Sequence, residues 1–228
     1  MNPIYKIGHR GAKGHLTENT LESISLALEM GIDGIEVDVH LCATGEVVVF
    51  HDFTLDRLSD GIGEVSTKTY DQLQDLTLKG GYKIPLLTEV LDLIEGKCSI
   101  NIELKGLNTA KSTCAIISKY IDKGWDYSSI LVSSFQENEL LEVKKINGNI
   151  LIAVLSKASV EEAIEWGKIL NATAIHPSIG IITRQSVIDA HNQGFNVNVW
   201  TVNEPEDIAR MIEFGVDGII SDYPDRLA

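Results

Sequence analysis

The sequence is poor in several residue types, and each scarcity excludes a class of protein. Its 228 residues include 3 cysteines, and Cys42, Cys98 and Cys114 show no metal or disulfide spacing, so buried reduced thiols are expected. Only 19 residues are basic against 33 acidic ones, and the formal charge of −14 excludes a nucleic-acid partner and gives no attraction to an anionic membrane. The longest clear apolar run, residues 150–155, is far shorter than the ~18 residues of a membrane span.

Several sequence motifs of catalysis and targeting are also missing. No Gly-x-Ser-x-Gly elbow, Walker loop or cysteine nucleophile occurs, which argues against acyl transfer and nucleotide hydrolysis. The N-terminal stretch "MNPIYKIGHRG" has no signal-peptide pattern, so a cytoplasmic location is expected. An acidic protein that handles an anion needs a local cationic centre, and a bound metal is one way to supply it.

Short β-branched runs alternate with helix-length amphipathic stretches, an order typical of βα units and a parallel sheet. The expected strands are residues 4–8, 34–39, 99–104, 130–134, 150–155, 172–176, 196–200 and 218–222. The helices between them are expected to begin near Thr20, Thr88, Asn108, Gln136, Ser159, Thr183 and Glu204.

Eight parallel strands with helices between them predict a closed (β/α)8 TIM barrel, in a single α/β domain spanning residues 1–228. The pentapeptides "GIDGI" at 31–35 and "GVDGI" at 215–219 support one repeated structural unit. A doubly wound open sheet is the alternative, but the chain has no Gly-rich nucleotide turn to favour it. The chain stops at "YPDRLA", so the last helix is expected to be absent or very short.

Two features interrupt this alternation after the second barrel strand. Only "CATGE", residues 42–46, separates that strand from "VVVF" at 47–50, and so short a link requires a hairpin. The polar, glycine-dotted stretch 53–85 is too long for an ordinary loop. It is expected to form an inserted lid or small subdomain over one end of the barrel.

The expected strand ends are rich in polar residues, and reactive groups of a barrel gather at the carboxyl ends of its strands. Glu36 and Asp38 lie two apart on one strand face, and Glu103 ends another strand with Lys105 on its own face. Three converging carboxylates without thiolates favour a hard cation, Mg²⁺ or Ca²⁺. The alternative is a set of surface or salt-bridged carboxylates, with Lys105 as a partner.

Two histidines at strand ends are the natural proton-transfer pair. His9 and His51 follow apolar strands, and imidazole titrates near neutral pH. Arg10 offers a planar fork suited to phosphate, although a salt bridge to Glu18 or Glu36 would also explain it. The other strand ends and the remaining histidines are weaker candidates: Trp200 and Thr201, Asp222, and His176, His15, His40 and His191.

Six stretches, taken in order, resemble the glycerophosphodiester phosphodiesterase family. They are "GHRG" with "ENT", "IEVDVHL", "VVVFHDFTLDR", "NIELK", "VNVWTVN" and "DGIISDYP". They run from residue 8 to residue 224, nearly the whole chain, and although each is weak alone the ordered set is highly specific.

This resemblance implies a TIM barrel with an insertion after the His51-Asp52 pair and one divalent cation, Mg²⁺ or Ca²⁺. The implied roles are metal ligation by Glu36, Asp38 and Glu103, acid–base catalysis by His9 and His51, substrate binding by Arg10, Lys105 and Trp200, and support of the histidine-arginine loop by Glu18 and Asn19. The partner is a small glycerophosphodiester.

The implied reaction is metal-dependent hydrolysis of that diester to glycerol 3-phosphate and an alcohol. The nucleophile is either water or the neighbouring glycerol hydroxyl, which would form a cyclic phosphate. Phospholipase D-like hydrolysis of lysophospholipids is an alternative with much the same site, and a barrel that only binds phosphate is another. A sugar-phosphate isomerase or aldolase would leave the paired histidines and the acid cluster unexplained.

Overall fold

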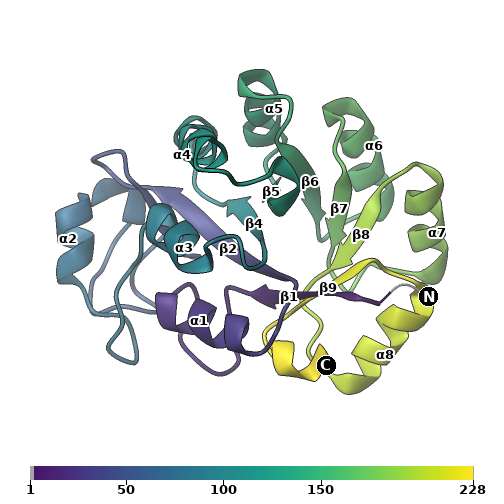
Figure 1. Ribbon diagram of the computed structural model, residues 1–228, viewed down its shortest axis with the longest axis horizontal. Helices are drawn as coiled ribbons and strands as arrows, with labels where there is room; N and C mark the ends of the chain where they lie inside the picture. Colours follow the sequence, from purple (N-terminus) through teal and green to yellow (C-terminus); the bar gives the residue numbers. More distant parts are fainter. Residues whose placement is uncertain (1–2, 228) are drawn as a thin grey trace.

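The computed structural model describes residues 3–227, whose strands form one closed sheet (Figure 1). The strands are β1 Tyr5–His9, β2 Gly34–Leu41, β3 Val47–Val49, β4 Ser99–Leu104, β5 Ile130–Ser134, β6 Leu151–Ser156, β7 Ala174–Pro177, β8 Asn196–Val199 and β9 Gly218–Ser221. They follow the order β1-β9-β8-β7-β6-β5-β4-β2-β3, and β1 also pairs with β2. This pairing closes eight parallel strands into a barrel, which confirms the (β/α)8 prediction, while β3 is added antiparallel to β2.

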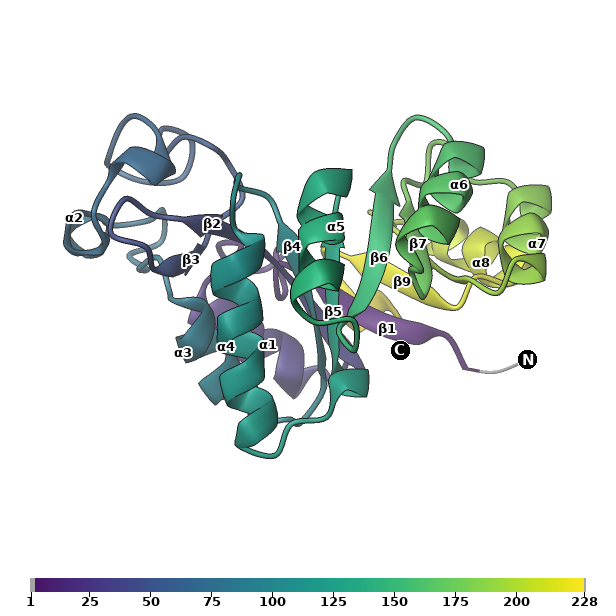
Figure 2. The same ribbon diagram turned by 90° about the horizontal axis from the view of Figure 1, so that it is seen from above.

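Helices follow the strands in the expected alternation, and all but the short helix of the insertion at 70–75 cover the outside of the barrel (Figures 1 and 2). They are α1 Leu21–Glu29, α2 Tyr70–Asp75, α3 Leu87–Ile94, α4 Ala110–Asp122, α5 Glu137–Ile146, α6 Val160–Leu170, α7 Arg184–Asn192 and α8 Pro205–Phe214. Among the residues that the structure describes, the last strand is followed only by a 3₁₀ turn, Pro224–Leu227, in agreement with the expected absence of a full helix there. Within residues 3–227, no helix combines the length and the apolar character needed to cross a membrane.

Hydroxyl side chains fix several of the helix starts. The side chains of Thr20, Ser159 and Thr183 each accept the backbone N–H of the residue three positions later. Such caps satisfy amide groups that have no partner inside the helix, and each contributes ~1 kcal/mol. The residues named in the sequence as helix starts are therefore the N-caps themselves at these three positions.

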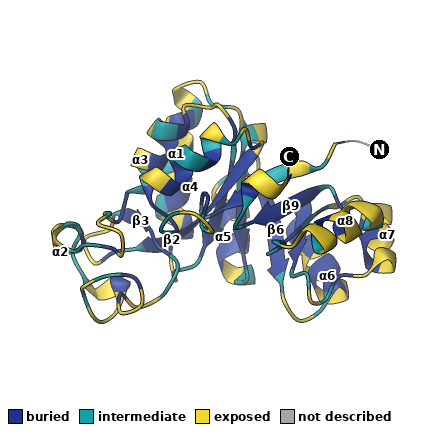
Figure 3. Cartoon of the chain, turned by 90° about the horizontal axis from the view of Figure 1, so that it is seen from below, coloured by how far each residue is buried: buried dark blue, intermediate teal, exposed yellow. Residues whose placement is uncertain are grey.

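The main core lies between the strands and the helices, where Figure 3 shows the dark blue strands inside the yellow outer faces of the helices. On β2, Ile35, Val37 and Val39 are fully buried in this core. Their neighbours Glu36 and Asp38 point to the barrel interior, because successive strand residues face opposite sides. This alternation places polar groups inside the barrel.

The hairpin strand β3 connects the barrel to the insertion. Its Val47 and Val49 belong to the barrel core, whereas Val48 and the following Phe50 belong to a second, smaller core. The second core also holds Cys42, Leu55, Leu58, Val65, Leu73, Leu78 and Ile84. The insertion thus packs beside β2 and β3 around apolar residues of its own, and it contains the short helix α2, which the sequence analysis did not predict.

The two repeated pentapeptides adopt the same local structure. Gly31 and Gly215 both have positive φ, at 70° and 82°, in the turn that follows a helix. Two residues later, Asp33 and Asp217 each accept a backbone N–H, from Lys6 of β1 and from Val197 of β8 respectively. Each pentapeptide therefore joins a helix to the next strand and ties that strand to its neighbour.

Candidate active site

A cavity of about 290 Å³ opens at the carboxyl ends of the barrel strands. Its lining residues are His9, Arg10, Glu36, His51, Asn101, Glu103, Lys105, Phe135, Leu155, Lys157, Trp200 and Ile220. Seven of these were selected from the sequence, and the other three selected residues, Asp38, Glu18 and Asn19, each contact Arg10 of the cavity wall. The barrel therefore brings together residues that are far apart in the sequence.

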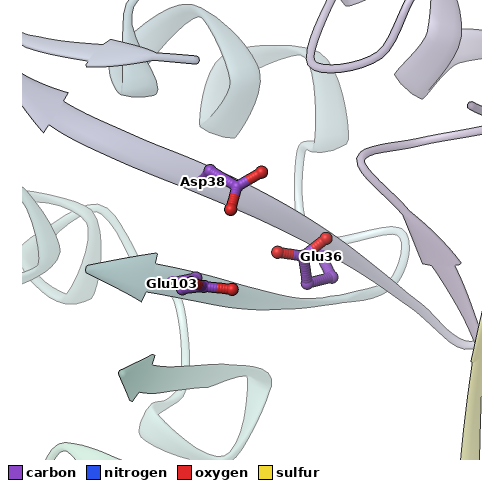
Figure 4. A group of neighbouring side chains, drawn as sticks. All are labelled: Glu36, Asp38 and Glu103. Atoms are coloured by element: carbon purple, nitrogen blue, oxygen red, sulfur yellow. The ribbon is translucent and has the colours of Figure 1, made fainter. Parts of the chain in front are cut away.

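The three carboxylates predicted as metal ligands meet inside the barrel (Figure 4). Glu36 and Asp38 stand on β2, and Glu103 on β4 is the register partner of Asp38. One oxygen of each carboxylate lies within 4.8 Å of the others, and all three residues are buried. Glu36 Oε1 and Asp38 Oδ1 have no hydrogen-bond partner among residues 3–227. Buried carboxylate oxygens left over in this way fit a divalent metal ion.

The ionisation of the carboxylates agrees with this fit. Burial, followed by the charges of Asp38 and Glu103, raises the pKa of Glu36 well above its ordinary value. Burial and the charge of Asp38 raise the pKa of Glu103 to about 7. Burial alone would also raise the pKa of Asp38, but nearby cations, chiefly Arg10, outweigh it and hold that pKa low. A cluster that resists full ionisation gains stability from a cation placed between its members.

Arg10 links the acidic cluster to the loop that precedes α1. Its Nε lies 3.1 Å from Asp38 Oδ2, and its Nη1 donates to Glu18 Oε1 at 2.7 Å. Asn19 donates from Nδ2 to the same Asp38 oxygen at 2.9 Å. Arg10 and Asn19 both have positive φ, at 52° and 59°. Of the two salt bridges considered from the sequence, the one to Glu18 forms.

Gly11 makes this sharp bend possible. Its φ is +80°, and a Cβ on this residue would lie 2.6 Å from the backbone carbon of Ser23. Only glycine tolerates both conditions without strain. The "HRG" stretch therefore ends β1 with two side chains that line the cavity and turns at once against the start of α1.

His9 at the end of β1 is buried and held by a carboxylate. Its Nδ1 lies 2.6 Å from Asp222 Oδ1, and its Nε2 lies 3.9 Å from Glu36 Oε2. Asp222 in turn accepts from Asn203 Nδ2 at 3.0 Å. Burial lowers the pKa of His9, and the hydrogen bond that its imidazole donates to Asp222 opposes that shift. The carboxylate therefore favours the protonated imidazole that burial disfavours.

His51, which follows the hairpin strand, has the same kind of partner. Its Nδ1 lies 2.6 Å from Asp52 Oδ1. Arg57 of the insertion donates to both oxygens of Asp52 and to both oxygens of Glu18. The hydrogen bonds from Arg57 are the largest of the effects that lower the pKa of Asp52 to about 2. Burial lowers the pKa of His51 itself.

Both cavity histidines thus carry a carboxylate on Nδ1, which leaves Nε2 as the nitrogen available for proton transfer. Asp222 stands at a predicted strand end and Asp52 next to His51, but their positions in the sequence alone indicated no role for either. Arg57 is the last residue of the "VVVFHDFTLDR" stretch, but it received no role because it lies within the insertion and not at a barrel strand end. Phe135 and Lys157 follow β5 and β6 and could have been found by the same strand-end rule that identified Trp200.

The other histidines lie outside the cavity wall. His176 was considered a candidate, but it is fully buried within the barrel, its Nε2 lies 3.0 Å from Asn198 Nδ2, and burial lowers its pKa to about 3. His40 Nε2 contacts the carbonyl oxygen of His51 at 3.1 Å. His15 and His191 form exposed pairs with Asp225 and Asp217.

A larger cavity of about 870 Å³ lies at the opposite end of the barrel, where the strands begin. Residues such as Tyr5, Ser99 and Leu131 line it, and it contains none of the three clustered carboxylates. Barrel chemistry takes place at the carboxyl ends of strands, so the smaller cavity is the candidate active site despite its size.

Comparison with known proteins shows to which family the chain is similar. Residues 9–226 match the model of the glycerophosphoryl diester phosphodiesterase family. A glycerophosphodiester phosphodiesterase of Caldanaerobacter subterraneus is 35% identical over 97% of this chain and 95% of its own length, and one of Bacillus altitudinis is 35% identical over 96% and 94%.

Solved structures of related proteins have the same fold. A phosphodiesterase of Oleispira antarctica, solved in complex with the product sn-glycerol-3-phosphate, is 29% identical with a TM-score of 0.89 over 97% of this chain and 94% of that one. A glycerophosphodiester phosphodiesterase of Thermotoga maritima is 29% identical with a TM-score of 0.81 over 99% and 97%. The family and enzyme class predicted from the sequence motifs are confirmed, and the chain belongs to the glycerophosphoryl diester phosphodiesterase family.

Proposed function

We propose that this chain hydrolyses glycerophosphodiesters to glycerol 3-phosphate and an alcohol, with His9 and His51 as the acid–base pair. The observation that most directly supports the proposal is that the two histidines are held in the same way. Each lines the cavity and has Nδ1 held at 2.6 Å by a carboxylate, in a cavity that also contains Glu36 and Glu103. The family to which the chain belongs supports the same activity.

The proposed metal ligands are Glu36, Asp38 and Glu103, which fit one divalent cation. Oxygen donors without thiolates select Mg²⁺ or Ca²⁺. Such an ion supplies positive charge that polarises the phosphodiester and offsets the charge developing on its oxygens.

Arg10 and Lys105 are proposed to bind the phosphate. Both line the cavity, and both already contact the acidic cluster: Arg10 lies beside Asp38, and Lys105 Nζ donates to Glu103 Oε1 at 3.1 Å. A phosphate that enters between them meets two cationic groups held in place before it binds. Trp200, whose indole N–H donates to the carbonyl of His176 at 2.7 Å, is proposed as a fixed wall for the glycerol or the leaving group.

The two histidines balance the proton transfers of the reaction. One Nε2 accepts the proton of the nucleophile as its oxygen bonds to phosphorus, and the other delivers a proton to the alcohol oxygen whose bond to phosphorus breaks. The nucleophile is water or the neighbouring glycerol hydroxyl, and a water then opens the cyclic phosphate in the second case. Both routes need the same pair of groups.

The loop around Glu18 and Asn19 and the insertion are proposed to support these groups. Glu18 accepts from Arg10 and Arg57, and Asn19 binds Asp38. The insertion, residues 53–85, is proposed as a small subdomain at the rim of the site, tied to it through Arg57. The cytoplasmic location expected from the sequence stays a prediction.

The test measures glycerol 3-phosphate released from glycerophosphoglycerol and glycerophosphocholine by EDTA-treated protein, before and after Mg²⁺ or Ca²⁺ is restored. Metal-dependent release is expected, and His51→Ala is expected to lower kcat by about 10²-fold or more. His191→Ala is the matched control, because His191 is also paired with a carboxylate but is exposed and outside the cavity. Metal-restored activity that survives His51→Ala would contradict the acid–base role.

Lysophospholipids supply the second substrate arm of the same experiment. Release of alcohol from lysophospholipids but not from the soluble diesters would favour the phospholipase D-like alternative. Phosphate binding without turnover of either class would favour a binding protein.

A further inference from the structure

The part of the cavity wall formed by residues of β6 and β9 and of the segments that follow β5, β6 and β8 combines apolar surface with positive charge. Phe135, Leu155, Trp200 and Ile220 form its apolar part. The Phe135 and Trp200 rings meet edge to face, with centroids 5.5 Å apart. Lys157, which follows β6, completes this part of the wall, and the two carboxylates of the cavity lining, Glu36 and Glu103, stand on β2 and β4 instead.

Two ammonium groups already occupy the vicinity of the Phe135 ring. Lys105 Nζ lies 5.6 Å from the ring centroid and Lys157 Nζ lies 5.9 Å from it. The charge of Lys105 is partly compensated by Glu103, whose Oε1 lies 3.1 Å from its Nζ. Among residues 3–227, no carboxylate lies within 4.0 Å of Lys157 Nζ. Lys157 therefore presents an uncompensated positive charge to the cavity.

The positive charge of Lys157 opposes the binding of a cationic group, which the two aromatic rings alone would favour. Aromatic pairs attract quaternary ammonium groups. At comparable separation and an effective dielectric constant of ~20, repulsion between two unit charges exceeds cation–π attraction. A choline group beside Phe135 and Trp200 would meet Lys157 as a like charge, whereas an anionic substituent would meet it as a partner.

We propose that the leaving alcohol lies against this wall and that Lys157 is a specificity-determining residue, which selects diesters whose leaving alcohol is anionic or neutral over those whose leaving alcohol is cationic. The inference rests on the proposed function and adds the substrate class to it. Lys157 acts on the leaving group and not on the reacting phosphorus. Replacing Lys157 should therefore change the ratio of kcat/KM between substrates more than it lowers the rate for all of them.

The test uses two matched pairs of diesters. Glycerophosphoinositol and glycerophosphoinositol 4-phosphate differ by an anionic group on the alcohol. Glycerophosphocholine and its 3,3-dimethylbutyl isostere differ by the cationic charge alone. The wild-type enzyme is expected to show the higher kcat/KM for the phosphorylated inositol ester and for the neutral isostere.

Lys157→Gln is expected to shift the ratio of kcat/KM between glycerophosphoinositol 4-phosphate and glycerophosphocholine by about tenfold toward choline, and Lys157→Glu to shift it further. Lys168→Gln is the control: it makes the same change of charge at an exposed position on α6, outside the cavity, and should leave the ratio unchanged. Added salt should reduce the wild-type preference, since exposed charges are screened.

The outcomes separate this inference from the proposed function. In one outcome the enzyme hydrolyses all four diesters while Lys157→Gln changes the ratio of kcat/KM between glycerophosphoinositol 4-phosphate and glycerophosphocholine by less than about twofold. This result would overturn the inference and leave the proposed function standing. A wild-type preference for the choline ester over its neutral isostere would also overturn it. No hydrolysis of any of the four diesters in the presence of Mg²⁺ or Ca²⁺ would overturn the proposed function, and the inference with it.

Discussion

The pairing of His9 with Asp222 gives a prediction whose size follows from the structure. The two side chains meet at 2.6 Å, and their exposed fractions are only 9% and 16%, so solvent screens the contact little. Asp222→Asn removes the negative charge and preserves the shape of the side chain. This matters because Asp222 also accepts from Asn203 and donates its backbone N–H to the Asn203 side chain.

The expected loss follows from the worth of a charged hydrogen bond. Such a bond contributes roughly 1.5–3 kcal/mol when one partner is ionised. A loss of ~2 kcal/mol in the transition state, where His9 carries or releases a proton, lowers kcat about 30-fold. The pH profile should also move. Burial lowers the pKa of His9 and Asp222 opposes this, so the substitution lowers that pKa further.

The assay is the pH dependence of kcat with saturating metal and glycerophosphoglycerol. The ionisation that belongs to His9 is expected at lower pH in the variant, whether His9 acts as the acid or as the base, because both limbs move with its pKa. Asp225→Asn is the control, since Asp225 pairs with the half-exposed His15 outside the cavity wall. A variant whose kcat stays within about threefold of wild type, with an unmoved profile, would refute the argument that Asp222 tunes His9.

Three further predictions concern the metal, the insertion and its core. Metal affinity, measured by calorimetry on metal-free protein, should fall as the pH drops below about 7. The reason is that Glu103, whose pKa is raised to about 7, must lose its proton to bind the metal. Glu103→Gln should weaken metal binding ~10–100-fold. Arg57→Gln should lower kcat about tenfold by releasing Asp52 and Glu18, whereas unchanged kinetics would show that its hydrogen bonds do not position His51. Leu73→Ala should lower the free energy of unfolding by ~2–5 kcal/mol, since Leu73 is fully buried in the second core. Amide hydrogen exchange should increase in residues 53–85 before it increases in the barrel strands, and an equal increase in both parts would contradict separate cores.

Much of the fold could be predicted from the sequence, because the residues that mark its strands and helix starts are neighbours in the chain. Each barrel strand is a short apolar run, and each helix outside the insertion starts within a few residues of the predicted position, with Thr20, Ser159 and Thr183 themselves serving as caps. The hairpin followed from the five residues that separate β2 from β3. These features depend on neighbours in the chain, so the sequence contains the information directly.

The insertion was harder to read because its order comes from contacts across its own length. Helix α2 has only 6 residues, and its buried Leu73 is held by residues from 42 to 84 in the second core. A helix this short has no stability alone. Composition could mark the segment as an insertion, but not show how it packs or that Arg57 reaches Asp52 and Glu18.

The residues at the strand ends, and therefore the candidates His9, His51 and the acid cluster, could be predicted from the sequence, because the two-residue period of a strand fixes which side chains share a face. The partners of these residues could not, because they depend on the tertiary structure. Asp222 lies 213 residues from His9, and closure of the barrel between β1 and β9 brings the two to 2.6 Å. Hydrogen bonds and pKa shifts depend on distance and burial in space, which chain spacing does not specify until the barrel has closed.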